Sequence, residues 1–245
     1  VYSGLTRINQ FPDDYYYTTA ISDSAVSFVR KHPDDVPMFM YVAHYAPHLP
    51  LHAPKKRVEA CRERYKVGYD VLRQQRFERQ KELGLVDKSM ELPVYQREFK
   101  DKRPAWTELS LRQQEQWITD MATYAAMIEI MDDGIGRLIE AVKEKGIYEN
   151  TVFLFMSDNG ATSEGGYLGQ LMADLSNTPY RSYKQWCFQG GTSSPLIVKY
   201  GNDVKNGVKE KGIICRTPSH IIDLFPTCLD MASVKYPSSF NGRKV

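Results

Sequence analysis

The chain has 245 residues, of which 42% are hydrophobic and 25% charged, and its formal net charge is +2. This composition is ordinary for a globular protein, and it excludes a disordered chain, a collagen-like repeat and a polybasic tail as descriptions of the whole. No apolar run approaches the roughly 20 residues of a membrane span. The length suffices for a sizeable core and corresponds to about one and a half average domains.

The beginning of the chain predicts a helix, a strand and a loop. Apolar residues recur at helical spacing over residues 18–32, where Thr18 or Ser22 could cap the first turn. The continuous apolar run over residues 36–43 is typical of a strand buried on both faces, as in a parallel sheet. Three prolines then exclude regular structure from residues 46–54.

Residues 55–115 differ in composition from the rest of the chain. They carry 16 Lys and Arg against 11 Asp and Glu, and they contain few apolar residues. This pattern predicts a charged helical insertion at about 55–115, made of solvent-facing helices and turns. A basic stretch could attract nucleic acid or another polyanion. The interleaved acidic residues and the absence of a binding motif favour a solvated face, and we expect no nucleic-acid partner.

The second half of the chain alternates helix and strand. A capping box at residues 110–113 predicts the start of a long helix, and Gly146 suits its left-handed end. Apolar runs predict strands at 152–156 and 196–200, and an amphipathic pattern predicts a helix over 221–232. This alternation predicts an α/β fold with a mostly parallel central sheet and helices on both faces.

Polar residues follow two of these strands. In an open α/β sheet, ligands bind at the carboxyl ends of the strands, where His44 and His48 follow the first strand and Asp158 and Asn159 follow the second. Carboxylate and amide oxygens suit a hard cation such as Ca²⁺ or Mg²⁺. Asp-Asn-Gly is also a common turn sequence, and two ligands fall short of the roughly six to eight oxygens around Ca²⁺.

A third segment of interest, residues 179–191, contains Lys184 and ends in the pair Gly190-Gly191. A lysine near a cation site would stabilise an anionic ester, and paired glycines permit close backbone approach. Taken alone, this segment is better interpreted as a glycine turn beside a surface lysine.

Several segments are weak signals singly, but their order along the chain makes them informative together. They are Met38–Leu51, Tyr124–Gly136, Asn150–Gly160, Tyr183–Gly191, Pro195–Val198 and Ser219–Thr227. Together they span most of residues 14–237 and resemble the arylsulfatases, the formylglycine-dependent sulfatases of the alkaline phosphatase superfamily. The resemblance implies an alkaline phosphatase-like fold and hydrolysis of aryl or carbohydrate sulfate esters.

The resemblance also implies roles for single residues. Asp158 and Asn159 would be two of the ligands of Ca²⁺, with Mg²⁺ as the other candidate metal. His48 would hydrogen-bond or protonate around the sulfate and the leaving oxygen, and Lys184 would bind a sulfate oxygen and the ester oxygen.

The other histidines of the chain match no catalytic position. His44 and His52 are expected to be packing or surface residues that could line the cleft, and His32 to lie at a helix end. The resemblance gives His220 and Asp223 a structural role in capping the last helix.

The chain departs from the family in what it lacks. The formylglycine precursor motif, Cys or Ser-x-Pro or Ala-x-Arg, surrounds none of the four cysteines, and the family's paired N-terminal aspartates have no counterpart. Because the family places both upstream, we expect residues 1–245 to be part of a single sulfatase-like domain, incomplete at both ends. Formylglycine would lie upstream, and the isolated chain should be inactive. Gln189 and Ser193 stand where many members have Glu and Arg.

Two alternatives to a sulfatase are compatible with these residues. One is a phosphate or phosphonate monoester hydrolase of the same superfamily, and the other is a non-catalytic module that binds a polyanion through residues 55–115. The expected partner is a small-molecule or glycan sulfate ester. The resemblance implies a periplasmic or secreted location, and the sequence does not indicate an oligomeric state.

Overall fold

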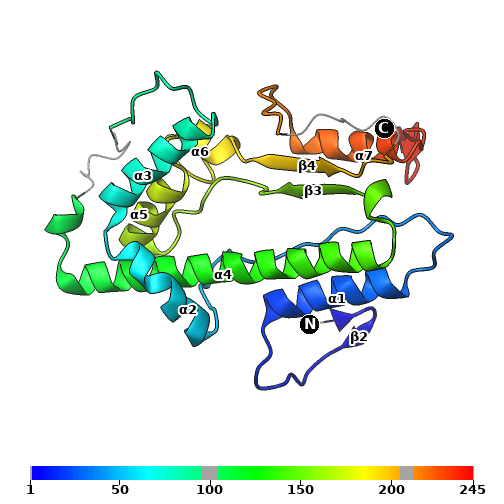
Figure 1. Cartoon of the computed structure of the whole chain (residues 1–245), viewed down its shortest axis with the longest axis horizontal. Coiled ribbons are helices and arrows are strands. Elements are labelled where there is room, and N and C mark those ends of the chain that lie inside the picture. The colour runs from blue at the N-terminus through cyan, green and yellow to red at the C-terminus, as the bar shows by residue number, and fades with distance from the viewer. Residues whose placement is uncertain (1, 95–103, 205–211, 245) are drawn as a thin grey trace. The chain divides into compact units, whose positions relative to one another are not determined.

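The computed structural model describes residues 2–94, 104–204 and 212–244 (Figure 1). The chain separates into two compact units, one made of Val1–Ile147 with Asn159–Ser193 and the other of Tyr148–Asp158 with Ser194–Val245. That residues 1–245 are part of one domain stays a prediction.

The first unit is mainly helical. Its helices are α1 (Tyr17–Lys31), α2 (Lys55–Arg62), α3 (Tyr69–Glu82), α4 (Leu111–Glu144), α5 (Gly166–Ser176) and α6 (Gln189–Thr192), with 3₁₀ helices at Glu63–Tyr65 and Trp106–Glu108. A short antiparallel pair, β1 (Tyr2–Ser3) and β2 (Thr6–Arg7), precedes them. The long helix α4 runs through the unit, and α1, α2 and α5 all pack against it (Figure 1).

The ends of α4 are those that the sequence predicts. Ser110 Oγ accepts a hydrogen bond from Gln113 N at 3.3 Å, and Gln113 Oε1 accepts one from Ser110 N at 3.0 Å. This reciprocal capping box satisfies backbone donors that have no partner within the helix. Beyond the other end, Gly146 has φ +77°, a conformation that glycine adopts without steric cost. The helix prediction is therefore confirmed at both ends.

Helix α1 lies closely against the C-terminal half of α4. A Cβ atom at Gly134 would come within 2.0 Å of Ser22 Oγ, so the absence of a side chain on α4 allows this approach. The capping prediction for α1 is wrong. Its N-cap is Tyr16, which makes no side-chain cap bond, while Thr18 and Ser22 are buried inside the helix. Ser22 Oγ donates to Thr18 O at 3.1 Å, and its position is explained by packing on α4.

An aromatic cluster forms the centre of the helical core. Tyr65, Tyr69, Trp106 and Trp117 meet nearly edge to face, with ring centroids 5.3 to 6.1 Å apart. Gly68, with φ +82°, allows the Trp106 ring to pack on the backbone, because a Cβ there would lie 2.4 Å from the ring. Edge-to-face pairs stabilise a core by about 0.5–1.5 kcal/mol each beyond their buried area.

This packing corrects the prediction of solvent-facing helices over residues 55–115, of which 95–103 lie outside the described residues. The segment is helical, as predicted. Part of its apolar content is buried, however: Cys61, Tyr69 and Phe77 are almost completely buried, whereas other apolar residues such as Val71 and Leu83 are exposed. The low apolar content of the segment does not reveal this burial, because only a few of its side chains reach the core.

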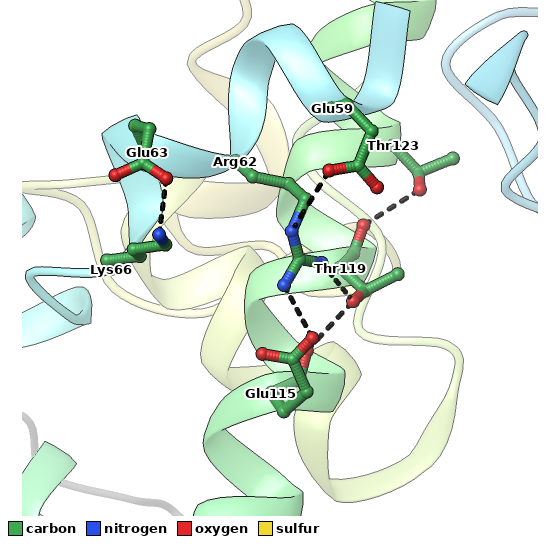
Figure 2. A network of polar contacts seen from close by, with 7 residues as sticks. All are labelled: Glu59, Arg62, Glu63, Lys66, Glu115, Thr119 and Thr123. Atoms are coloured by element: carbon green, nitrogen blue, oxygen red, sulfur yellow. Dashed lines mark hydrogen bonds and ion pairs between the residues drawn. The ribbon is translucent and has the colours of Figure 1, made fainter. Parts of the chain in front are cut away.

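The charged face of the same segment pairs with acidic residues (Figure 2). Arg62 reaches from α2 to two residues of α4, donating to Thr119 Oγ1 at 2.7 Å and pairing with Glu115. On its own helix it also pairs with Glu59, at 3.6 Å. Exposed ion pairs of this kind contribute little stability, typically about 0–1 kcal/mol. Their arrangement supports the interpretation as a solvated face and weakens the case for a polyanion-binding surface.

The second unit contains the two longest strands. These strands are β3 (Val152–Met156) and β4 (Leu196–Tyr200). The unit also contains the helix α7 (Leu224–Met231) and 3₁₀ helices at Tyr148–Asn150 and Ile221–Asp223. A short hairpin pairs β5 (Ser239–Phe240) with β6 (Arg243–Lys244), strands of two residues each. Strands β3 and β4 pair in antiparallel register, with Val152 opposite Tyr200 and Met156 opposite Leu196. The predicted strands 152–156 and 196–200 are confirmed residue for residue.

The α/β class is confirmed, but the mostly parallel sheet is wrong for the part of the chain that the structure describes, where all strand pairs are antiparallel. The run over residues 36–43 forms no strand there. Its side chains alternate in exposure as in a strand, and Phe39 and Tyr41 are exposed. The prediction of a strand buried on both faces is therefore wrong for this run in the described structure. An apolar run does not identify the neighbouring strand on which its pairing, direction and burial depend.

Candidate active site

His48 lies in the proline-rich loop that follows the extended segment. Pro47 and Pro50 flank it and prevent regular structure, and the loop turns through a hydrogen bond from His48 N to Tyr45 O at 3.0 Å. His48 Nδ1 lies 2.8 Å from Leu49 O. Because a carbonyl oxygen only accepts, Nδ1 carries the proton, and Nε2 of the neutral ring is then an acceptor.

Lys184 lies on a loop whose backbone is unusual. Ser182 and Gln185, on either side of it, have φ values of +64° and +81°, in the left-handed region that non-glycine residues rarely adopt. Lys184 N donates to Ala161 O at 2.9 Å. Strained backbone of this kind is retained where the surrounding contacts over-determine it, and it clusters at functional sites.

The structure brings Lys184 and His48 together, although 136 residues separate them in the chain. Lys184 Nζ lies 3.3 Å from His48 Nε2, so the ammonium group can donate to the imidazole. Glu164 Oε1 is 3.8 Å from the same ammonium group, whose side chain is 26% exposed. An anion bound beside Lys184 Nζ would contact the half-buried ammonium group and lie close to Nε2 of His48.

Three glycines set the spacing of the backbone around this pair. Gly160 N donates to Gly191 O at 3.0 Å, and a Cβ at Gly160 would lie 1.7 Å from Gly190 O. A Cβ at Gly190 would lie 1.9 Å from Ser182 O. The paired glycines thus serve close backbone approach, one of the two roles considered from the sequence, because neither has a positive φ.

Asp158 and Asn159 lie just beyond β3, after Ser157, as predicted, and the boundary between the two units falls between them. Asn159 Nδ2 donates to Gly160 O at 3.2 Å. A carboxylate and an amide oxygen fit a hard cation by their chemistry. Among residues 2–94, 104–204 and 212–244, no three or more His, Cys, Asp or Glu side chains gather as a metal site.

The other histidines have packing or capping surroundings. Burial lowers the pKa of His44, whose Nδ1 is buried without a hydrogen-bond partner in the described structure. His52 lies beside the Tyr16 ring, with centroids 5.8 Å apart. His32 is the C-cap of α1.

His220 and Asp223 cap the turn before α7. His220 Nδ1 accepts from Ile222 N at 3.2 Å, and Asp223 Oδ2 accepts from His220 N at 2.7 Å. The structural role that the resemblance implied for this pair is therefore confirmed as a capping box.

Two further residues near Lys184 and His48 could not be predicted from the sequence. Glu164 faces Lys184, and Asn177 bonds to both loops around it. In the sequence, Asn177 reads only as the end of a helix before Thr178-Pro179, and Glu164 as part of a glycine turn. Neither pattern indicates that the side chain reaches a distant loop.

Comparison with known proteins defines the class. Residues 2–234 match the family model described as Sulfatase, and the chain belongs to the sulfatase family. The solved structure of Ps i-CgsB matches with a TM-score of 0.58 at 25% identity, over 94% of this chain and 37% of that one. Its complex with k-i-k-neocarrahexaose gives the same TM-score at 24% identity, which supports the same fold.

Curated relatives are similarly distant. An arylsulfatase of Klebsiella aerogenes is 30% identical over 251 residues, which cover 91% of this chain and 52% of the relative. An uncharacterized sulfatase of Schizosaccharomyces pombe is 29% identical, over 95% of this chain and 46% of the relative. The N-acetylgalactosamine-6-sulfatase of Mus musculus is 32% identical over 120 residues, 47% of this chain and 20% of the relative. The chain thus spans about half the length of the first two relatives.

Within the described ranges, none of the helices combines the length and the apolar character that crossing a membrane requires.

Proposed function

We propose that the full-length protein to which this chain belongs hydrolyses sulfate esters, and that His48 and Lys184 act on the sulfate group. The observation that carries the proposal is the distance of 3.3 Å between Lys184 Nζ and His48 Nε2, in a chain of the sulfatase family. Two side chains from distant loops that converge on one point fit the recognition of one small charged group.

Lys184 binds a sulfate oxygen and the ester oxygen. Its ammonium group opposes the charge that develops on the ester oxygen as the S–O bond breaks, and partial burial strengthens this interaction. An incoming sulfate competes with Glu164 for the same ammonium group, and the separation of 3.8 Å makes this existing ion pair a weak one.

His48 holds or delivers a proton at Nε2. With Nδ1 committed to Leu49 O, the neutral ring accepts at Nε2, and the protonated ring donates there to the leaving oxygen. The bond to Leu49 O thus occupies one ring nitrogen, and Nε2, which lies 3.3 Å from Lys184 Nζ, is the nitrogen proposed to act on the sulfate ester.

A divalent cation, Ca²⁺ or Mg²⁺, would be held by Asp158 and Asn159 and would neutralise charge on the sulfate. Two side chains do not complete its coordination. We propose that the remaining ligands, and the formylglycine nucleophile, come from sequence outside these 245 residues. The isolated chain is therefore expected to show no turnover.

The substrate partner is proposed to be a small-molecule or glycan sulfate ester. One relative is named an arylsulfatase and another an N-acetylgalactosamine-6-sulfatase, so both aryl and carbohydrate sulfates belong in a substrate panel. A periplasmic or secreted location is proposed on the family resemblance.

The test is turnover of an aryl sulfate and of the matched aryl phosphate by the full-length protein. We expect the sulfate to be the better substrate, and Lys184→Ala to lower kcat/KM for it by about 100- to 1,000-fold. Lys143→Ala, which removes an exposed lysine of α4 that pairs with Glu140, should stay within about 2-fold of the unaltered protein. Faster phosphate turnover, or full activity of Lys184→Ala, would overturn the proposal.

A further inference from the structure

We propose that Asn177 is a positioning residue for Lys184: its side-chain amide joins the lysine loop to the loop that follows Asn159 and sets the place of the ammonium group. This inference rests on the proposed function, because it assigns Asn177 a part in the action of Lys184.

The side chain of Asn177 bridges two loops. Its Oδ1 accepts from Ala161 N at 3.0 Å, and its Nδ2 donates to Ser182 O at 2.9 Å. Lys184 N donates in turn to Ala161 O at 2.9 Å. The three hydrogen bonds thus tie the N–H and the C=O of Ala161 to the lysine loop. One link runs through the Asn177 side chain to Ser182, and the other runs directly to Lys184.

Asn177 is itself fixed to a packed helix. Asn177 is the C-cap of α5, where its N donates to Ala173 O at 2.8 Å and its O accepts from Tyr180 N at 2.8 Å. Helix α5 is anchored in the core through Leu171 and Leu175, both almost completely buried. A residue fixed to a packed helix can hold a loop in place, whereas a residue on a second loop would move with it.

The lysine loop needs such a restraint because its backbone is strained. Ser182, whose carbonyl accepts from Asn177, and Gln185 both lie in the left-handed region, which is unfavourable for residues with a side chain. Without the bond to Asn177, Ser182 could relax toward a common conformation. Lys184 lies two residues further on, so a change of φ at Ser182 redirects its side chain.

A simpler role for Asn177 is to end α5, since asparagine is common at helix C-termini. That role uses the backbone of Asn177, which makes the helix-end bonds. The side-chain bonds go to Ala161 and Ser182, outside the helix. The two roles predict different results when Lys184 is absent, and this difference is the basis of the test.

The experiment is a double-mutant cycle in the full-length protein with an aryl sulfate as substrate. Asn177→Ala should lower kcat by about 10- to 100-fold, the scale expected for a misplaced catalytic group. In a Lys184→Ala background, the same change should lower kcat by less than about 3-fold, because the group it positions is gone. A role confined to folding would lower both backgrounds equally.

Gln80→Ala is the matched control. Gln80 Nε2 donates to Thr178 O at 2.9 Å, so this variant removes an amide-to-backbone bond from the neighbouring residue and leaves the bridge intact. It should keep kcat within about 2-fold. A loss as large as that of Asn177→Ala would show general loosening of the segment and overturn the inference.

Amide hydrogen exchange separates this inference from the proposed function. In Asn177→Ala, the amides of Ala161 and Lys184 should exchange at least about 10-fold faster, and in Gln80→Ala they should not. Unchanged exchange overturns the bridge whatever the activity. Absence of sulfate turnover in the unaltered protein overturns sulfate ester hydrolysis, and faster exchange in Asn177→Ala then still supports the bridge.

Discussion

Two regions of the first unit are held together in different ways. Around α4, helices pack through side chains, and Trp117 lies completely buried among aromatic neighbours. Around Lys184, loops are held by backbone hydrogen bonds, by glycines without room for a Cβ, and by the Asn177 bridge. The helical region resembles the core of many small domains, whereas the loop region depends on a few close backbone contacts.

This difference separates stability from function. Loss of a buried side chain removes apolar contacts and lowers the free energy of unfolding, while the loops keep their own hydrogen bonds. Displacement of a loop backbone changes the place of Lys184 or His48 with little loss of buried area. Changes in the helical region should therefore act on stability, and changes in the loops on turnover.

The largest expected effect is that of Trp117→Ala. Its ring is 0% exposed, and truncation of a buried Trp costs about 3–5 kcal/mol of unfolding free energy. Turnover per folded molecule should change by less than about 2-fold. Denaturant unfolding combined with kinetics checks both statements. Leu111→Ala, at an 83% exposed position on the same helix, is the control and should cost under about 0.5 kcal/mol. A large fall in the turnover of fully folded Trp117→Ala protein would contradict the separation of stability from function between the two regions.

Gly160→Ala should give the opposite result. The added Cβ would lie 1.7 Å from Gly190 O, so the two loops must separate, and we expect kcat/KM to fall by about 100-fold. Gly136→Ala is the matched control, because its Cβ meets nothing within 4 Å. That change should leave turnover intact and stabilise α4 by about 0.5–1 kcal/mol. Equal turnover of the two variants would contradict the role of close backbone approach.

The smallest expected effect is a pH dependence at His44. Burial lowers the pKa of His44 from its ordinary value of 6.5, so the unfolded state binds the proton more readily. The free energy of unfolding is therefore not reduced by His44 above about pH 6.5. It falls as the pH drops below that value, because the unfolded state binds the proton first, and it stops falling once the folded protein also binds the proton. His44→Gln should reduce this slope between about pH 7.5 and pH 5 in urea unfolding. An unchanged slope would show that His44 does not contribute.

Much of the local structure could be predicted from the sequence, because it depends on neighbouring residues. The capping box at Ser110, the left-handed end at Gly146 and the strands β3 and β4 follow from short-range patterns. The pairing of β3 with β4 could not be predicted, since an apolar run does not identify its partner. The burial within residues 55–94 could not be predicted because the few buried apolar residues stand among many charged ones.

For the candidate site, the sequence by itself determined which residues are proposed to carry the chemistry: His48, Lys184, Asp158 and Asn159 were chosen from residue type and motif order. Only the tertiary structure decided that His48 and Lys184 meet at 3.3 Å, that Glu164 faces the same ammonium group and that Asn177 ties the loops together. The physical reason is the range of the interactions. Caps and strand patterns act within a few residues, whereas these contacts join loops whose approach depends on the packing of α5 and on glycines that leave room for it.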